Sequence, residues 1–212
     1  MESLSPQQLA HFNTFGFVHL RALFTPEEVQ TLSAEMATAH AAAESRDPFD
    51  EGVTKSVRML SDSTPFFQGL GEDPRFLGAA RQMYGDDVFY HGCDANRWAG
   101  DTAWHCAPPA PAFVCCYAGA GGVRQRLLCC TGDHHIDPAL DCFGVKLCVY
   151  LDPLTEDTGA LRLVVGSHRD PLHTELRTMR EENGGALPEG LPCHVCETTP
   201  GDVVAFDMRA SQ

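Results

Sequence analysis

The sequence predicts an α+β fold, with helices in the first part of the chain and strands in the second. The last of the predicted helices ends at Gly85, and short β-branched or aromatic runs begin near residue 88. Such segregation favours an α+β fold over an alternating α/β fold. Short strands separated by turn residues are typical of a sandwich or barrel. At 212 residues, the chain is long enough for one core, so a single domain over residues 1–212 is expected.

Three helices are predicted, and each begins where a capping residue precedes a proline. The pairs are Ser5-Pro6, Thr25-Pro26 and Asp73-Pro74, in which the first side chain caps the helix and the proline suits its first turn. The first helix is expected to end at Gly16 and the third at Gly85, because glycine favours helix ends. The second is expected to run through VQTLSAEMATAHAAA.

Five short runs have the β-branched and aromatic composition of strands. Turn signals separate them, including Asp152-Pro153, Asp157-Thr158-Gly159 and Pro200-Gly201-Asp202. Residues 45–65 are polar and irregular. The expected strands are residues 17–20, 88–91, 145–151, 160–165 and 203–206.

The acidic composition excludes several classes of partner. A net charge of −14 would repel nucleic acids and anionic membranes. No apolar run approaches the roughly 20 residues that a membrane-spanning helix needs, and the N-terminus lacks the basic and apolar regions of a secretory signal. We therefore expect an intracellular, cytoplasmic protein whose partners are neither nucleic acid nor membrane. The sequence does not indicate its oligomeric state.

One stretch departs from this composition. Residues 106–132 contain no acidic residue and hold five of the ten cysteines. The run separates GDTAWH from DHHID, two segments rich in polar residues and histidine. A structureless loop of this length is uncommon, so we expect a foreign insertion, such as an unspliced intron. A natural surface loop is the alternative, because long insertions cost little entropy.

Histidine and aspartate residues gather around this run in a pattern that suits a metal site. Residues i and i+2 of a strand point to the same face, so an H-x-D sequence directs an imidazole and a carboxylate to one point. A further histidine completes the 2-His-1-carboxylate set that holds Fe(II) and leaves positions open for oxygen. Solvated loop groups or hydrogen-bonded core residues are the alternative. The candidates are His105, Asp133, His134, His135, Asp137, His168 and His173.

Four segments carry a resemblance to a known family: LSPQQLAHFNTFGFVHLRALFTPEEV, CDANRWAGDTAWH, GVKLCVYLDPLTEDTGALRLVVGSHR and PGDVVAFDMR. In this order they resemble the phytanoyl-CoA dioxygenase family, which are Fe(II)- and 2-oxoglutarate-dependent oxygenases. The resemblance covers nearly the whole chain except residues 106–132. It implies a double-stranded β-helix of the jelly-roll, cupin-like type, preceded by helices.

In the family, the first two metal ligands lie in the motif W-H-x-D, whereas Trp104-His105 is followed here by Cys106-Ala107. If residues 106–132 are removed, the motif reappears with His105 and Asp133 as metal ligands. The second choice is the uninterrupted His135-Ile136-Asp137, which lies closer to the next strand than the family places its pair. The third is His105 alone, in the H-x-A pattern of the family's halogenase relatives.

The resemblance implies Fe(II) and 2-oxoglutarate as cofactors, and O2 and a small organic molecule, which becomes hydroxylated, as substrates. Lys146 is expected to bind a carboxylate of 2-oxoglutarate, because Lys146, Cys148 and Tyr150 share one strand face and would line the barrel. A solvated edge lysine is the alternative. Asp94, Asn96 and Arg97 lie just upstream of the site and are expected to contact the substrate. For Arg97, an ion pair with a neighbouring acidic residue is the alternative.

The resemblance also implies that this chain is incomplete and catalytically inactive. The family's distal histidine follows the PGDVVAFD strand within a few residues, and an arginine that holds 2-oxoglutarate comes later. Here the sequence reaches Gln212 without either, so the last barrel strands are expected to be missing. His168, in GSH, is expected to hydrogen-bond at a turn and not to replace the distal ligand.

Two other functions stay open on sequence grounds. A family fold does not guarantee the family's activity, so a non-catalytic binding or scaffold protein is one alternative. A zinc-binding protein is the other, because Cys193 and Cys196 form a CxxC pair that the pairs Cys115-Cys116 and Cys129-Cys130 could complete.

Overall fold

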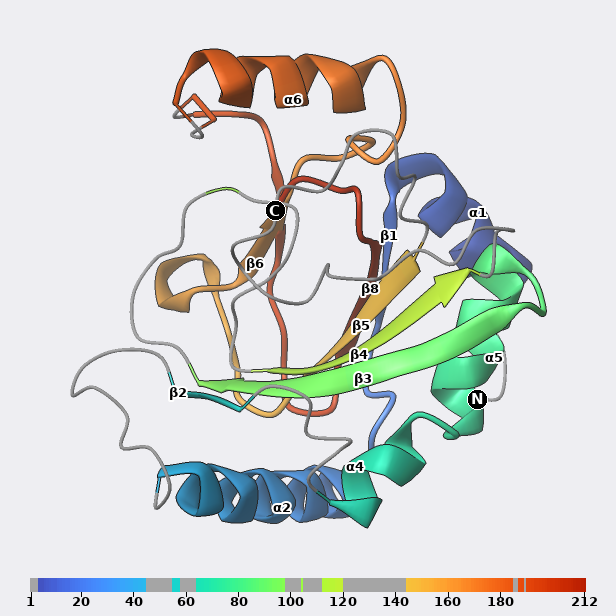
Figure 1. Ribbon diagram of the computed structural model, residues 1–212, viewed down its shortest axis with the longest axis vertical. Coiled ribbons are helices and arrows are strands. Elements are labelled where there is room, and N and C mark those ends of the chain that lie inside the picture. Colours follow the sequence, from blue (N-terminus) through green and yellow to red (C-terminus); the bar gives the residue numbers. More distant parts are fainter. Residues whose placement is uncertain are drawn as a thin grey trace.

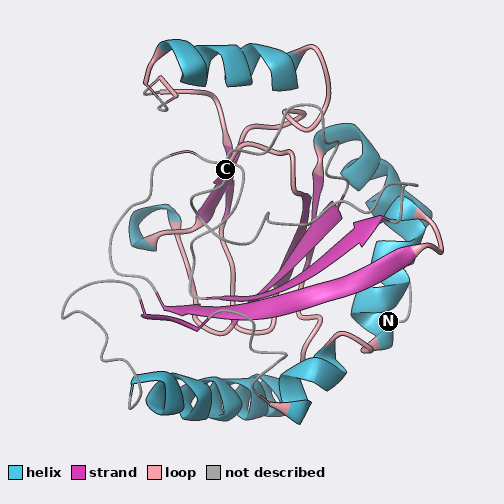
Figure 2. Cartoon of the chain, viewed as in Figure 1, coloured by secondary structure: helices cyan, strands magenta, loops and turns pink. Residues whose placement is uncertain are grey.

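The computed structural model contains two antiparallel sheets and the helices around them (Figures 1 and 2). It describes residues 4–44, 55–57, 64–97, 104, 112–119, 144–184, 187–188 and 190–212. The helices are α1 (Pro6–Phe15), α2 (Pro26–Glu44), α4 (Pro65–Leu70), α5 (Pro74–Tyr84) and α6 (Leu172–Glu182), with a short 3-10 helix η1 (Glu156–Thr158). The strands are β1 (Phe17–Leu20), β2 (Lys55–Val57), β3 (Val88–Arg97), β4 (Ala112–Gly119), β5 (Gly144–Tyr150), β6 (Leu161–Leu163), β7 (His194–Cys196) and β8 (Val203–Asp207).

The three predicted helix starts are confirmed at α1, α2 and α5. Ser5 accepts a hydrogen bond from the amide of Gln8, and the Gln8 side chain accepts one from the amide of Ser5. Thr25 and Glu28 repeat this exchange at the start of α2. α1 ends at Gly16, whose φ of 85° lies in the left-handed region that glycine adopts readily.

The larger sheet has the strand order β1-β8-β5-β4-β3-β2, and every neighbouring pair is antiparallel. β6 and β7 form a separate antiparallel pair. All five predicted strands are present, as β1, β3, β5, β6 and β8, although β3 is longer than expected and β6 is shorter. The sequence analysis did not predict β2, β4, β7, α4 or α6.

β4 lies inside the run of residues 106–132. It fills the middle of the larger sheet, where its register with β5 extends from Ala112↔Tyr150 to Ala118↔Gly144. On its other side it pairs with β3. The foreign origin of the run stays a prediction, but in this fold part of the run hydrogen-bonds to strands on both sides.

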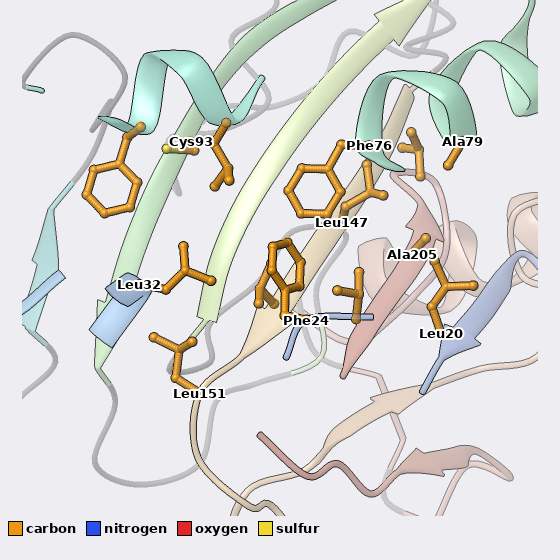
Figure 3. Close-up of a cluster of buried hydrophobic side chains, with 14 of the residues drawn as sticks. Leu20, Phe24, Leu32, Phe76, Ala79, Cys93, Leu147, Leu151 and Ala205 are labelled. Carbon is orange, nitrogen blue, oxygen red and sulfur yellow. The ribbon is translucent and has the colours of Figure 1, made fainter. Parts of the chain in front are cut away.

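The larger sheet is covered on both faces. We call one the helix face, because α1, α2, α4 and α5 pack on it through a cluster that includes Leu32, Phe76 and Leu147 of β5 (Figure 3). The other, the interior face, turns toward β6 and β7 and packs a second cluster that includes Phe206 and Leu163. Burial of each large apolar side chain contributes about 1.5–3 kcal/mol, so the two clusters together hold the sheet between its layers.

No helix in the described part of the chain is long and apolar enough to cross a membrane.

Candidate active site

The interior face of β5 carries the three residues whose shared face the sequence predicted. Lys146, Cys148 and Tyr150 alternate with residues of the helix face, and all seven residues of β5 are buried. Cys148 and Tyr150 belong to the cluster that packs against β6 and β7. Lys146 therefore lies on the side of the sheet enclosed by the smaller strand pair, and the alternative of a solvated edge lysine is wrong.

Lys146 brings a positive charge into this enclosed space. Only 1% of the residue is exposed, and no hydrogen bond or ion pair joins it to another residue that the structure describes. An ammonium group that is buried without a partner costs several kcal/mol. The position therefore suits an anionic ligand, whose carboxylate would supply the missing counter-charge.

The two neighbours of Lys146 on this face remain neutral. Burial raises the pKa of the Cys148 thiol to about 12, although the nearby charge of Lys146 acts in the opposite direction. Burial also raises the pKa of Tyr150 well above its ordinary value. The Tyr150 hydroxyl is buried and has no hydrogen-bond partner among the described residues. Neither group can neutralise Lys146, and Tyr150 keeps a free polar atom inside the fold.

Trp104, which directly precedes the first predicted metal ligand in the sequence, has a defined position in the fold. It packs against a small cluster formed by Val164, Leu176 of α6 and Leu187. The amide of Val164 donates a 2.9 Å hydrogen bond to the carbonyl oxygen of Ser211, in the segment that follows β8.

The predicted metal ligands His105 and Asp133, and the second choice His135 and Asp137, lie outside the described residues. Among the described residues, no group of three or more histidine, cysteine, aspartate or glutamate side chains is placed to hold a metal ion. The ligand assignment therefore stays a prediction.

The predicted substrate residues end β3. In the backbone register, Asn96 pairs with Ser56 and Arg97 with Lys55 of β2. Their position at the sheet is therefore defined, and their contact with substrate stays a prediction.

His168 is buried at 3% exposure, and neither of its ring nitrogens forms a hydrogen bond within the described structure. Its ring instead lies on the backbone of Gly16, where a β-carbon would come within 2.5 Å of Nδ1. Burial lowers the pKa of His168, which favours the neutral imidazole. Close packing on the end of α1 is thus the contact that the structure gives this residue.

Of the cysteines proposed for zinc, Cys193 and Cys196 have described side chains. The side chains of Cys115, Cys116, Cys129 and Cys130 lie outside the described residues. Cys196 is buried in the interior cluster, whereas Cys193 precedes β7 and is half-buried. Residues three apart in an extended chain point to opposite sides, so the pair does not form half of a tetrahedral site.

Sequence reasoning missed two buried carboxylates that organise the sheet ends. Asp202 accepts hydrogen bonds from the amides of Ala22 and Thr199, and its Oδ2 lies 2.9 Å from Nη1 of Arg21 and 3.2 Å from Nε2 of His19. The sequence showed only a Pro-Gly-Asp turn at this position.

The second carboxylate is Asp207, at the end of β8. Tyr84 donates a hydrogen bond to it, and Arg209 contacts both of its oxygens. The only signal in the sequence was an aspartate directly after a buried strand, with an arginine two residues later.

Known proteins resemble this chain in both sequence and fold. The sequence profile described as phytanoyl-CoA dioxygenase (PhyH) matches residues 12–211. An ectoine dioxygenase from Bordetella bronchiseptica is 30% identical over 229 aligned positions, which cover 100% of this chain and 63% of that protein. The chain thus spans 63% of the length of this curated relative.

Solved structures of HygX from Streptomyces hygroscopicus share the fold. The structure with nickel, 2-oxoglutarate and hygromycin B bound is 25% identical, with a TM-score of 0.67 over 98% of this chain and 80% of HygX. The structure with iron bound is also 25% identical, with a TM-score of 0.65 over 99% of this chain and 79% of HygX.

Proposed function

The chain belongs to the phytanoyl-CoA dioxygenase family, and on this basis we propose that the protein is an Fe(II)- and 2-oxoglutarate-dependent dioxygenase that hydroxylates a small organic substrate. The family match over residues 12–211 carries the proposal. The metal and 2-oxoglutarate bound to HygX support it. Because the chain spans 63% of its curated relative, the proposal concerns the activity of the whole protein.

The proposed fold follows from the same membership. In it, the six-stranded sheet and the β6–β7 pair are the two sheets of a double-stranded β-helix in one domain. The interior face of the larger sheet then lines the reaction space, and the helices cover its outer face. This arrangement places Lys146 of β5 inside and keeps Leu147 outside, in agreement with the alternation of β5 between the two clusters.

Lys146 is the proposed partner of a 2-oxoglutarate carboxylate. A buried cation that has no counter-charge in the described part of the chain fits a dianionic cofactor, because binding would supply a charge-assisted hydrogen bond to a costly buried ammonium. The neutral Cys148 and Tyr150 on the same face would not compete for Lys146. The apolar cluster around them would exclude water from the bound cofactor.

His105 and Asp133 are the proposed protein ligands of Fe(II), and a third ligand is required from elsewhere. An imidazole and a carboxylate are suitable donors for Fe(II). When bound together, the metal, 2-oxoglutarate and O2 supply the oxidising chemistry that converts a substrate C–H bond into C–OH. Trp104 would orient His105 through its packing on the cluster of α6, while Asn96 and Arg97 at the end of β3 would contact the substrate.

Anaerobic titration of the full-length protein with Fe(II) and 2-oxoglutarate tests this proposal. The expected result is a weak visible charge-transfer band that appears only when both are present, followed on exposure to O2 by formation of succinate. An unchanged spectrum, with no succinate, would contradict the proposal and favour a non-catalytic binding protein. Zinc retained through dialysis, with no such band, would favour the zinc-binding alternative.

A further inference from the structure

Asp94 of β3 lies on the interior face of the larger sheet. Its Cα is paired with Val114 of β4, and Val114 is paired in turn with Cys148 of β5. Directly opposed residues of antiparallel strands share one face. Asp94 therefore shares a face with Cys148, and so with Lys146.

The neighbours of Asp94 in β3 confirm this orientation. Cys93 and Ala95 are buried at 1% and 0% exposure, and both belong to the cluster of the helix face. Because side chains alternate along a strand, Asp94 must point the other way. It is half-buried, in contrast to the two residues that flank it.

Lys146 and Asp94 thus bring opposite charges to one enclosed face. Neighbouring strands are about 4.8 Å apart, so β3 lies roughly 10 Å from β5. A small molecule beside a cofactor held at Lys146 would come within reach of Asp94. Asp94 already has an electrostatic or hydrogen-bonding contact, which a substrate group would join or replace.

We infer that Asp94 selects substrates that carry a protonated amine, and this inference rests on the proposed function for the location of the reaction. An ammonium group would form a charge-assisted hydrogen bond to the carboxylate, whereas an acidic substrate would be repelled by it and by a dianionic cofactor. The net charge of −14 acts in the same direction, because it raises the local concentration of cations.

A matched pair of cyclitols tests the inference on the full-length protein. Streptamine carries two amino groups where scyllo-inositol carries hydroxyl groups, and calorimetry at neutral pH gives the affinity of each. We expect streptamine to bind at least about tenfold more tightly than scyllo-inositol. Asp94→Asn should weaken streptamine binding by about 10- to 100-fold and leave scyllo-inositol binding unchanged. Asp94→Glu, which keeps the charge, should retain part of the preference.

Asp152→Asn is the control, because it removes an equal charge from an exposed position and should leave both affinities unchanged. Equal binding of the two cyclitols, or equal streptamine binding by the wild type and Asp94→Asn, would overturn the inference. The iron and 2-oxoglutarate band is recorded separately. If this band is absent but streptamine still binds in a manner that depends on Asp94, the proposed function is refuted and the inference about Asp94 is supported.

Discussion

The hydroxyl of Tyr84 donates a 2.6 Å hydrogen bond to Oδ2 of Asp207 and so joins α5 to the end of β8, across 123 positions of sequence. Arg209 contacts the same carboxylate, with Nη2 at 2.7 Å from Oδ2 and Nε at 3.0 Å from Oδ1. The Asp207 side chain is only 2% exposed. The buried carboxylate of Asp207 thus links β8 to α5 through Tyr84, and the donors of Tyr84 and Arg209 both stabilise its charge.

Tyr84→Phe should therefore destabilise the protein. Removing a donor from a buried carboxylate costs about 1.5–3 kcal/mol, and urea denaturation measures the change in the free energy of unfolding. Tyr90→Phe is the matched control, because its hydroxyl donates to a neutral acceptor, the carbonyl oxygen of Phe67, at 3.2 Å. The free energy of unfolding of this control should fall by less, about 0.5–1.5 kcal/mol. Equal losses in the two variants would show that the charge of Asp207 does not matter.

Gly16→Ala should be more destabilising than Gly159→Ala. Both glycines end a helix in the left-handed region, with φ values of 85° and 94°, so both variants incur about 1–2 kcal/mol of backbone cost. Only at Gly16 does the new β-carbon meet a side chain, the ring of His168. Thermal unfolding of both variants gives the difference.

A double-mutant cycle shows whether contact with the His168 ring causes the difference in stability between the two variants. If the ring causes it, Gly16→Ala and His168→Ala together should cost less than the sum of the two single changes. Additive costs would place the strain in the backbone alone.

Asp202 should make folding stability fall in acid. Burial would raise the pKa of Asp202, but hydrogen bonds from the amides of Ala22 and Thr199 and from Arg21 outweigh it and hold the pKa below its ordinary value. A carboxylate with a lowered pKa in the folded state stabilises above its unfolded pKa of about 3.9, and this stabilisation is lost as the pH falls toward the folded value.

Urea denaturation as a function of pH measures this contribution. The free energy of unfolding should decline below about pH 4 in the wild type, and Asp202→Asn should remove that part of the decline. The variant should also lose about 1.5–3 kcal/mol at neutral pH. If the free energy of unfolding of Asp202→Asn declined below about pH 4 as much as that of the wild type, other groups would be responsible for the pH dependence.

Cap–proline pairs precede all five described α-helices, but the sequence analysis used only three of them. Thr64-Pro65 marks the start of α4 in the same way and was overlooked. The cap–proline pairs located α1, α2 and α5 because capping involves only residues close in sequence. α6 has apolar residues at Leu172, Leu176 and Met179, but Pro171 stands at its cap position without a capping side chain. The sequence nevertheless has the cap–proline pair Asp170-Pro171 just before α6, and the Asp170 carboxylate accepts a hydrogen bond from the Thr174 amide. The sequence analysis overlooked this pair, and packing of Leu176 against Val164 adds to the stability of the helix.

The candidate site was predicted only in part. Alternation within β5 was enough to predict that Lys146, Cys148 and Tyr150 share a face. The face of Asp94 could not be predicted, because it depends on the register across β4. That strand lies in residues 106–132, which the sequence analysis set apart as an insertion, so the β-branched and aromatic residues Phe113, Val114 and Tyr117 were not interpreted as a strand.

Leu176→Ala should weaken metal binding without disrupting the main core. The substitution removes a buried contact in the small cluster that holds Trp104, and the proposed ligand His105 follows Trp104 directly. We expect a several-fold loss of Fe(II) affinity, measured by anaerobic titration. Met179→Ala, at a 39% exposed position of the same helix, is the control and should bind Fe(II) as the wild type does. Equal Fe(II) affinities of Leu176→Ala and Met179→Ala would show that packing of α6 does not affect metal binding.

The most direct test of the central claim is the thermal stability of Lys146→Met with and without 2-oxoglutarate in the presence of Fe(II). Replacing a buried ammonium that has no ion-pair partner among the described residues by an apolar side chain of similar length should leave the free protein as stable as the wild type or up to about 1–4 kcal/mol more stable. 2-Oxoglutarate should raise the melting temperature of the wild type, because a ligand that binds the folded state stabilises it, and should have little effect on the variant. An equal shift in both proteins would contradict the role of Lys146 as the residue that binds 2-oxoglutarate.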